Sequence, residues 1–315
     1  SVGDIDSDGQ DEILLAQNGL SDPYFLTQDG STPYSEDRFI IMSVSGDIGG
    51  FGAAIVEEYS MSPRDVDKDG SRENGLGGGS PQGAVVCDTD GDGLKEAACF
   101  SWQNLAVFFI EATGTDAYTI GDTTYVKLAS VDDWTLEATV ADMNDDGKDE
   151  VYVAGYADSK LFAIVDVNGD ATHLVDSTET STIATGVQHG ASASPGFGLF
   201  VGGNNTGTDI HKFDLSPGGN PADAASWTAS SYGFDNSLSG FVSKLSSGFE
   251  FTEGVKSVAL AYMSVADSLQ VIDGTDTTMV LNTGAFGVRV AEWDPTLSIR
   301  DIVLIMPDDY KLAQN

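Results

Sequence analysis

The sequence predicts an all-β protein, a β-propeller built of four-stranded antiparallel blades. Short runs rich in Val, Ile, Phe and Ala alternate with segments rich in Gly, Asp, Asn and Ser, which is typical of strands joined by turns. No apolar stripe of helical period extends over three turns. A similar unit also recurs at intervals of roughly 40–55 residues, which indicates a repeat architecture.

The predicted strands are apolar runs of four to six residues, short enough for strands and too short for helices. They are Glu12–Ala16, Ala84–Cys87, Leu105–Ile110, Glu150–Ala154, Leu161–Val165, Gly198–Val201, Ser257–Tyr262, Val288–Trp293 and Asp301–Met306. In a propeller each blade buries both faces against its neighbours, so several blades are needed to form a stable ring.

The repeat predicts one propeller domain over residues 1–315. An acidic loop followed by an apolar strand begins at Val2, Val86 and Val140, whereas later units keep only the strand. Seven blades would average about 45 residues each, and six is the alternative count. Two blades are then expected between Asp4 and Asp88, one of them starting near Gly50-Phe51-Gly52. Two side-by-side β-sandwiches are the alternative architecture.

The strongly acidic composition argues against negatively charged binding partners. The chain has 315 residues, with 14 Lys plus Arg against 50 Asp plus Glu, which gives a formal net charge of −36. Nucleic acids and anionic membranes are disfavoured because like charges repel. No apolar run approaches the ~18 residues of a membrane-spanning helix, so membrane insertion is not expected. Because the chain starts at Ser1 without an initiator Met or a signal peptide, we expect a mature or excised segment of a longer polypeptide.

The two cysteines, Cys87 and Cys99, exclude a disulfide-dense scaffold. A disulfide between them and two reduced, buried thiols are equally compatible with the sequence.

Four acidic loops of nine residues share one pattern, numbered here from position 1 at the first Asp. A carboxylate or amide stands at positions 1, 3 and 5, Gly at position 6 and Glu at position 9, and position 7 offers its backbone carbonyl. Loop one holds Asp4, Asp6, Asp8, Gln10 and Glu12; loop two Asp65, Asp67, Asp69, Ser71 and Glu73; loop three Asp88, Asp90, Asp92, Leu94 and Glu96; loop four Asp142, Asn144, Asp146, Lys148 and Glu150.

This pattern predicts three to four Ca²⁺ ions. Alternate side chains of a tight turn converge on one point, where several carboxylates repel unless a cation is bound. Ligands that are all oxygen favour a hard ion, and flexible coordination by many oxygens favours Ca²⁺ over Mg²⁺. An EF-hand is excluded, because it requires Glu at position 12 and flanking helices. Loop two is the weakest match, because the glycine-rich segment 74–79 follows it where a strand is expected.

These loops resemble the FG-GAP/VCBS family of calcium-binding propeller repeats, the repeat type of integrin α-subunit heads. Loops one, three and four carry the match, and Gly50-Phe51-Gly52 resembles the Phe-Gly start of the repeat. The resemblance implies a propeller that is often seven-bladed and usually extracellular, with each Ca²⁺ in a hairpin loop. It implies no single activity: members serve adhesion and carbohydrate recognition, and rhamnogalacturonan lyases use related propellers.

The expected function is therefore that of an extracellular, calcium-stabilised module for binding or adhesion, or of a structural component of a cell-surface assembly. A protein or a glycan is the expected partner, and self-assembly or neighbouring domains are further options. A secreted polysaccharide lyase or another glycan-active enzyme is the alternative.

The sequence nominates no catalytic residue. G-x-S-x-G and P-loop motifs are absent, and Ser80 and His189 are better explained by a turn and a blade edge. Trp102 and Trp134 are candidates for sugar stacking, although blade packing explains the tryptophans better. The segments Asn18–Asp37 and Leu215–Ser231 are expected to be loops on a propeller face.

Overall fold

The computed structural model describes residues 1–17, 38–45, 54–61, 81–101, 106–119, 125–127, 135–155, 161–166, 175–179, 187–204, 210–232, 240–252, 255–264, 268–273, 276–282, 287–291, 301–305 and 311–313. In this part of the chain the fold is all-β, with several four-stranded antiparallel sheets. The one helix of the described residues is a three-residue 3₁₀ turn, Ala224–Ser226. Among the same residues, no helix has the length and apolar character needed to cross a membrane.

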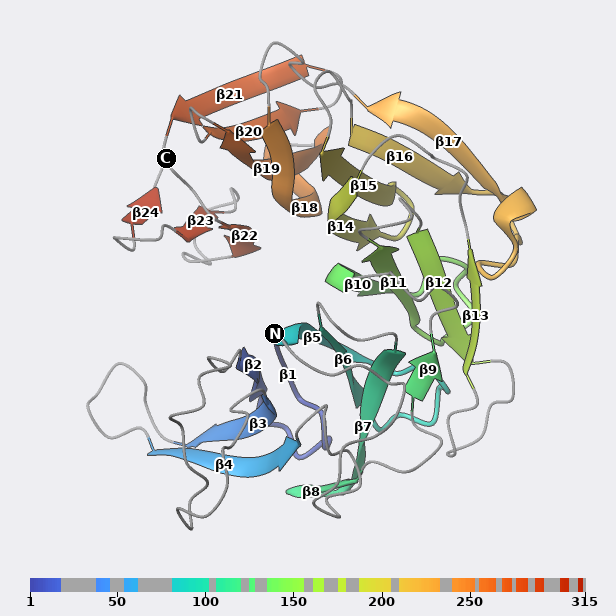
Figure 1. Ribbon diagram of the computed structural model, residues 1–315, viewed down its shortest axis with the longest axis vertical. Coiled ribbons are helices and arrows are strands. Elements are labelled where there is room, and N and C mark those ends of the chain that lie inside the picture. The colour runs from blue at the N-terminus through green and yellow to red at the C-terminus, as the bar shows by residue number, and fades with distance from the viewer. Residues whose placement is uncertain are drawn as a thin grey trace, which may run out of the picture. The chain divides into compact units, whose positions relative to one another are not determined.

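The first two sheets follow each other along the chain (Figure 1). The first has the order β1-β2-β3-β4 and comprises β1 (Val2–Gly3), β2 (Glu12–Gln17), β3 (Arg38–Ser45) and β4 (Ala54–Met61). The second has the order β5-β6-β7-β8, with β9 paired to β7. Its strands are β5 (Pro81–Cys87), β6 (Glu96–Ser101), β7 (Ala106–Gly114), β8 (Ala117–Thr119) and β9 (Tyr125–Lys127).

The remaining strands form three more sheets. The third has the order β10-β11-β12-β13 and comprises β10 (Thr135–Ala141), β11 (Glu150–Gly155), β12 (Leu161–Asp166) and β13 (Val175–Glu179). The fourth is eight-stranded and comprises β14 (Val187–Ser194), β15 (Gly198–Asn204), β16 (Ile210–Leu215), β17 (Trp227–Tyr232), β18 (Gly240–Thr252), β19 (Val255–Ser264), β20 (Ser268–Asp273) and β21 (Asp276–Asn282). The last comprises β22 (Gly287–Ala291), β23 (Asp301–Ile305) and β24 (Lys311–Ala313).

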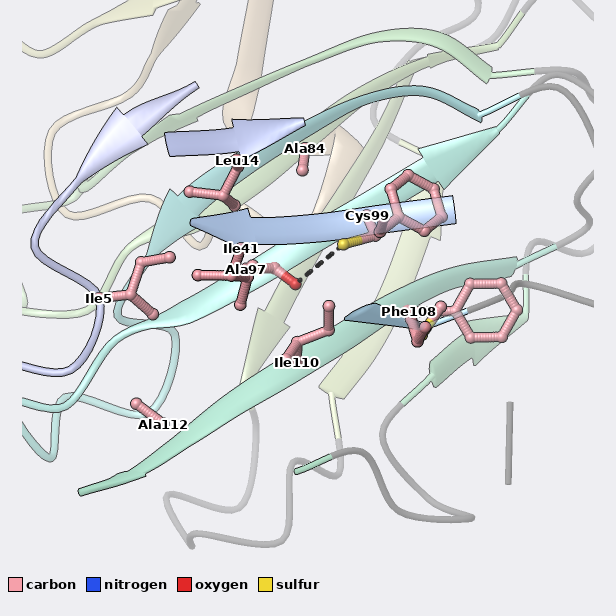
Figure 2. Close-up of a cluster of buried hydrophobic side chains, with 11 residues drawn as sticks. Ile5, Leu14, Ile41, Ala84, Ala97, Cys99, Phe108, Ile110 and Ala112 are labelled. Atoms are coloured by element: carbon pink, nitrogen blue, oxygen red, sulfur yellow. Dashed lines mark hydrogen bonds between the residues drawn. The ribbon is translucent and has the colours of Figure 1, made fainter. Parts of the chain in front are cut away.

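The first two sheets share one hydrophobic core (Figure 2). Leu14 and Ile41 come from the first sheet, and Ala97, Phe108 and Ile110 come from the second. All five are at most 3% exposed, so the two sheets exclude water from the space between them. Burial of this kind contributes about 25 cal/mol per Å² of apolar surface. The packing of one sheet face on the next is the contact that a repeat fold requires.

A second core joins strands of the third sheet to strands β15–β17. Tyr152 and Leu161 contribute from β11 and β12, and Leu199, Phe213 and Trp227 contribute from β15, β16 and β17. The Tyr152 and Trp227 rings meet edge to face with centroids 5.7 Å apart. The Trp227 indole N–H donates to the carbonyl oxygen of Pro221 at 3.0 Å. Trp227 therefore serves the packing role that the sequence favoured for its tryptophans.

Each predicted strand coincides with an observed strand, and several observed strands extend beyond the predicted ends by a few residues. Leu105, residues 292–293 and Met306 of the predictions lie outside the described part of the chain. Two expectations need correction. Ala54–Met61, just after Gly50-Phe51-Gly52, pairs with β3 as the fourth strand of the first sheet and does not start a new one. Within Leu215–Ser231, expected to be a loop, Trp227–Tyr232 is a strand because its residues pair along β16. Residues 18–37 lie outside the described part of the chain.

Cys87 and Cys99 are both buried free thiols, so the reduced alternative holds. The Cys99 thiol donates to the carbonyl oxygen of Ala97 at 3.6 Å (Figure 2). Burial raises the pKa of both thiols, which keeps them protonated.

Internal contacts divide the chain into two compact units. The first consists of Ser1–Val140, Gly147–Val151 and Ile164–Ser177, and the second of Ala141–Asp146, Tyr152–Ala163 and Thr178–Asn315. That residues 1–315 form one domain stays a prediction.

Candidate functional site

Three of the four acidic loops lie in the described part of the chain, and each joins the first two strands of a sheet. Loop one connects β1 to β2, loop three connects β5 to β6, and loop four connects β10 to β11. Loop two, with Asp65, Asp67, Asp69, Ser71 and Glu73, lies outside the described residues.

The three loops have the same backbone geometry. At position 5, the backbone N–H donates to the side-chain oxygen of position 3, in Asp8 to Asp6 at 3.2 Å, Asp92 to Asp90 at 3.0 Å and Asp146 to Asn144 at 3.0 Å. Positive φ angles recur at positions 4 and 6: Ser7 at 61°, Gly91 at 75° and Asp145 at 59°, then Gly9 at 90°, Gly93 at 88° and Gly147 at 89°. The sequence predicted the turn at position 6 but not the left-handed residue at position 4.

The position-6 turn gives a direct test of this geometry. Replacing Gly93 by Ala is expected to lower the free energy of unfolding by about 1–2 kcal/mol, because an L-residue is strained at positive φ. Nothing lies within 4 Å of the added methyl group, so the cost is backbone strain alone. Asp145→Gly relieves the same strain at position 4 and is expected to be neutral or stabilising. Urea unfolding of both variants measures the difference, and equal effects would contradict the shared geometry.

Carboxylates gather inside each loop in the same order of burial. Carboxylate oxygens lie within 4.8 Å of one another in three groups: Asp4, Asp6 and Asp8; Asp88, Asp90, Asp92 and Glu96; and Asp142, Asp146 and Glu150. At position 1 the residue is half-buried and at position 5 it is exposed, whereas the position-3 residues Asp6 and Asp90 are 4% and 8% exposed. The structure therefore brings together ten of the fifteen ligands predicted in these three loops.

The glutamate at position 9 is hydrogen-bonded to the backbone at position 2 of its own loop in loops one and three. A Glu12 carboxylate oxygen accepts the backbone N–H of Ile5 at 2.8 Å, and Glu96 accepts that of Thr89 at 2.9 Å. The pKa of Glu12 is raised from 4.5 to about 7, mainly by burial and in part by Asp6, Glu58 and Asp8, against the lowering effect of the Ile5 bond. Glu12 is absent from the loop-one group of converging oxygens, so its observed role is to hold the loop.

The remaining predicted ligands contribute polar contacts within their loops. The Gln10 side-chain amide donates to Asp8 at 3.1 Å, and the Asn144 amide donates to Asp146 at 2.8 Å. For Leu94 and Lys148, a role of the backbone carbonyl as ligand stays a prediction.

Glu111 is a carboxylate at loop three that the loop pattern did not include. It is the cross-strand partner of Glu96 in the β6–β7 ladder, and its side chain is hydrogen-bonded to that of Glu96. Burial is the main cause of the raised pKa of both carboxyl groups, with Asp90 adding to both. In the sequence Glu111 only follows the apolar run Leu105–Ile110, and it is the β6–β7 register that places it beside Glu96.

A further acidic group adjoins loop one. Asp6, Glu58 and Asp116 also place carboxylate oxygens within 4.8 Å of one another. The Asp116 backbone N–H donates to Asp6 at 2.6 Å, and the Tyr118 hydroxyl donates to Glu58 at 2.9 Å. These donors offset part of the repulsion between the three carboxylates.

The loops fit a hard divalent cation. Asp4 Oδ1 is buried and has no hydrogen-bond partner among the described residues, so a buried acceptor there needs a donor or a cation. Every converging atom is a carboxylate oxygen, without nitrogen or sulfur, which is the donor set that Ca²⁺ prefers.

The residues considered from the sequence for catalysis or sugar stacking are not part of the acidic loops. Ser80, Trp102 and Trp134 are outside the described residues, and His189 lies in β14, where its side chain is also outside the described part.

Comparison with known proteins bears on the fold. No protein-family model matches the chain, and no curated protein sequence matches it. The chain is similar to the solved structure of BBS1N in complex with ARL6DN, with 11% identity and a TM-score of 0.51, over 97% of this chain and 87% of that chain.

Two further solved structures match with lower scores. Dihydro-heme d1 dehydrogenase NirN in complex with DHE matches at 12% identity and a TM-score of 0.47, over 96% of this chain and 56% of the NirN chain. Apo AztD from Citrobacter koseri matches at 10% identity and a TM-score of 0.41, over 86% of this chain and 74% of that chain. All three structures have β-propeller-type folds. The similarity to BBS1N supports a propeller-like fold for this all-β chain.

Proposed function

We propose that the chain is an extracellular β-propeller stabilised by Ca²⁺ that acts as a binding or adhesion module, or as a structural component of a cell-surface assembly. The observation that carries the proposal is the recurrence of one loop geometry at three successive sheets, with carboxylate oxygens converging in each. Asp4 Oδ1, buried without a partner among the described residues, marks where a cation would bind in loop one.

The repeats are proposed to be of the FG-GAP/VCBS type. Support comes from the acidic loops between the first and second strands of the first three sheets. Among the described residues, one pair, Asn204 and Phe241, links β15 to β18, so we divide the eight-stranded sheet into two four-stranded meanders. The described strands then form six successive meanders, which supports six blades, and seven stays the count implied by the sequence average.

Calcium would neutralise the clustered carboxylates of Asp88, Asp90, Asp92 and Glu96 and of the matching residues in loops one and four. The chain's own residues shape the loops: position 3 orients position 5 in all three described loops, and position 9 holds the backbone at position 2 in loops one and three. Extracellular fluid holds Ca²⁺ near millimolar, which occupies sites with Kd of about 10⁻⁵ M, whereas cytosolic levels leave them mostly empty. This difference supports an extracellular location.

A binding role is favoured over catalysis because the carboxylates that converge in the described residues lie in the loops or beside loop one, and because the sequence carries no catalytic motif. The partner is proposed to be a protein or a glycan recognised by the blade-connecting segments, where binding residues commonly lie.

A binding screen tests the proposal. The protein is applied to glycan and extracellular-protein arrays in Ca²⁺, in EDTA, and in EDTA followed by Ca²⁺. Binding that is lost and then restored supports the module. Asp90→Asn should weaken it, while Asp11→Asn, which alters an exposed residue outside the ligand positions, should not. Release of sugar products from polysaccharides, or binding that is indifferent to Ca²⁺, would contradict the proposal.

A further inference from the structure

Position 8 joins the acidic loops of successive sheets to each other. The backbone N–H of Lys95, at position 8 of loop three, donates to the carbonyl oxygen of Ile5 in loop one at 3.1 Å. The backbone N–H of Asp149, at position 8 of loop four, donates to the carbonyl oxygen of Asp88 in loop three at 2.8 Å. The same position thus bonds to the described acidic loop of the preceding sheet at both junctions.

At loop three, a side chain adds to this junction. Asp149 Oδ2 accepts the backbone N–H of Asp88 at 3.0 Å. The residue Asp149 therefore binds both the N–H and the C=O of Asp88, which fixes the peptide groups on the two sides of its Cα. Asp88 Oδ1 in turn accepts the backbone N–H of Gly91 at 2.8 Å, and this bond fixes the orientation of the Asp88 carboxylate relative to the loop.

We infer that Asp149 is a positioning residue for the cation site of loop three, supplied by the following repeat. The inference rests on the proposed function. Asp149 stands at position 8 and is not one of the converging groups Asp88, Asp90, Asp92 and Glu96. It acts through Asp88, because a carboxylate whose backbone is fixed loses less conformational freedom when a cation binds. Substitution of residues that orient metal ligands in this way commonly lowers metal affinity by 10–100-fold.

Two physical effects of Asp149 have to be separated. Its negative charge attracts any cation at loop three, and its oxygen orients Asp88. Asp149→Asn removes the charge and keeps an acceptor for the Asp88 N–H, whereas Asp149→Ala removes both. Asp11→Ala is the matched control, because Asp11 occupies position 8 of loop one, is exposed, and makes no hydrogen bond to another loop among the described residues.

Calorimetric titration of each full-length variant with Ca²⁺ tests the inference. Asp149→Ala is expected to weaken one site about tenfold, and Asp149→Asn should stay near wild type, as should Asp11→Ala. In an Asp90→Asn/Asp92→Asn background, which disables loop three, Asp149→Ala should change nothing further. Unfolding in EDTA is measured alongside, because a merely structural role would alter that stability and leave the affinity unchanged.

The outcomes are distinct. If Asp149→Asn loses as much affinity as Asp149→Ala, the residue acts only through its charge and the inference is overturned. It is also overturned if Asp149→Ala behaves like Asp11→Ala, or if its effect persists without loop three. A protein that binds no Ca²⁺ at all would instead overturn the proposed function together with the inference.

Discussion

Removal of Ca²⁺ with EDTA is expected to lower the free energy of unfolding by about 8 kcal/mol. A ligand present at a hundred times its Kd stabilises the folded state by about 2.7 kcal/mol per site, and three loops of shared geometry are described. Because whole proteins are stable by only about 5–15 kcal/mol, chelation should leave a marginal fold. The midpoint of thermal unfolding should fall by more than about 10 °C.

The cause is the repulsion that each loop contains without a cation. In loop three, four carboxylate oxygens lie within 4.8 Å of one another, and Asp90 and Glu96 are almost fully buried. Backbone N–H donors satisfy some of these oxygens, as at Asp92 and Thr89, but they carry no full positive charge. The folded state therefore depends on a cation more than the unfolded chain does, in which the same groups are separated and hydrated.

Thermal and urea unfolding in Ca²⁺, in EDTA and in EDTA plus excess Ca²⁺ measure the effect. Mg²⁺ should restore less stability than Ca²⁺, because it requires closer and more regular octahedral coordination. Asp90→Asn should reduce the difference between the two conditions, and Asp11→Asn should leave it unchanged. Unfolding curves that coincide with and without EDTA would contradict a structural role for Ca²⁺.

The sequence predicted the parts of this fold that depend on neighbouring residues. The spacing of Asp4, Asp6 and Asp8 placed their carboxylates together because alternate residues of a tight turn converge, and the structure brings them together. Apolar runs such as Leu105–Ile110 became strands buried on both faces, since residues 107–110 are fully buried. These features were predictable because they depend on local turn chemistry and on hydrophobic content, both of which can be determined from the sequence.

The parts that depend on strand register were not predictable in the same way. Glu111 meets Glu96 only because β7 pairs with β6 in one particular register, and Asp149 meets Asp88 only because one repeat follows another. Trp227–Tyr232 lies in a segment that is rich in Gly, Ala, Ser and Pro, yet it forms a strand because β16 offers an unpaired edge. Tertiary pairing thus overrode local composition at these positions.

The calcium-free protein is expected to become less stable as the pH rises, the reverse of the usual behaviour of carboxylates in ion pairs. Burial and neighbouring acids raise the pKa of Glu12 to about 7 from its ordinary 4.5, and they also raise the pKa of Glu96 and Glu111. Between the unfolded and the folded pKa, the folded state binds more protons than the unfolded state. Stability is then complete below about pH 4.5 and falls as the pH passes through about 7 and above.

Bound Ca²⁺ should remove this dependence, because a cation favours the charged carboxylates and competes with protons for them. In EDTA, urea unfolding should therefore give a higher free energy of unfolding at about pH 5 than at about pH 8. In Ca²⁺, the two values should be equal, or the value at about pH 8 should be the higher one. Glu111→Gln should flatten the curve in EDTA, because it removes one buried acid beside Glu96, whereas the exposed Asp11→Asn should not. A calcium-free protein that is more stable at about pH 8 would mean that these carboxylates are stabilised by the fold itself and need no cation.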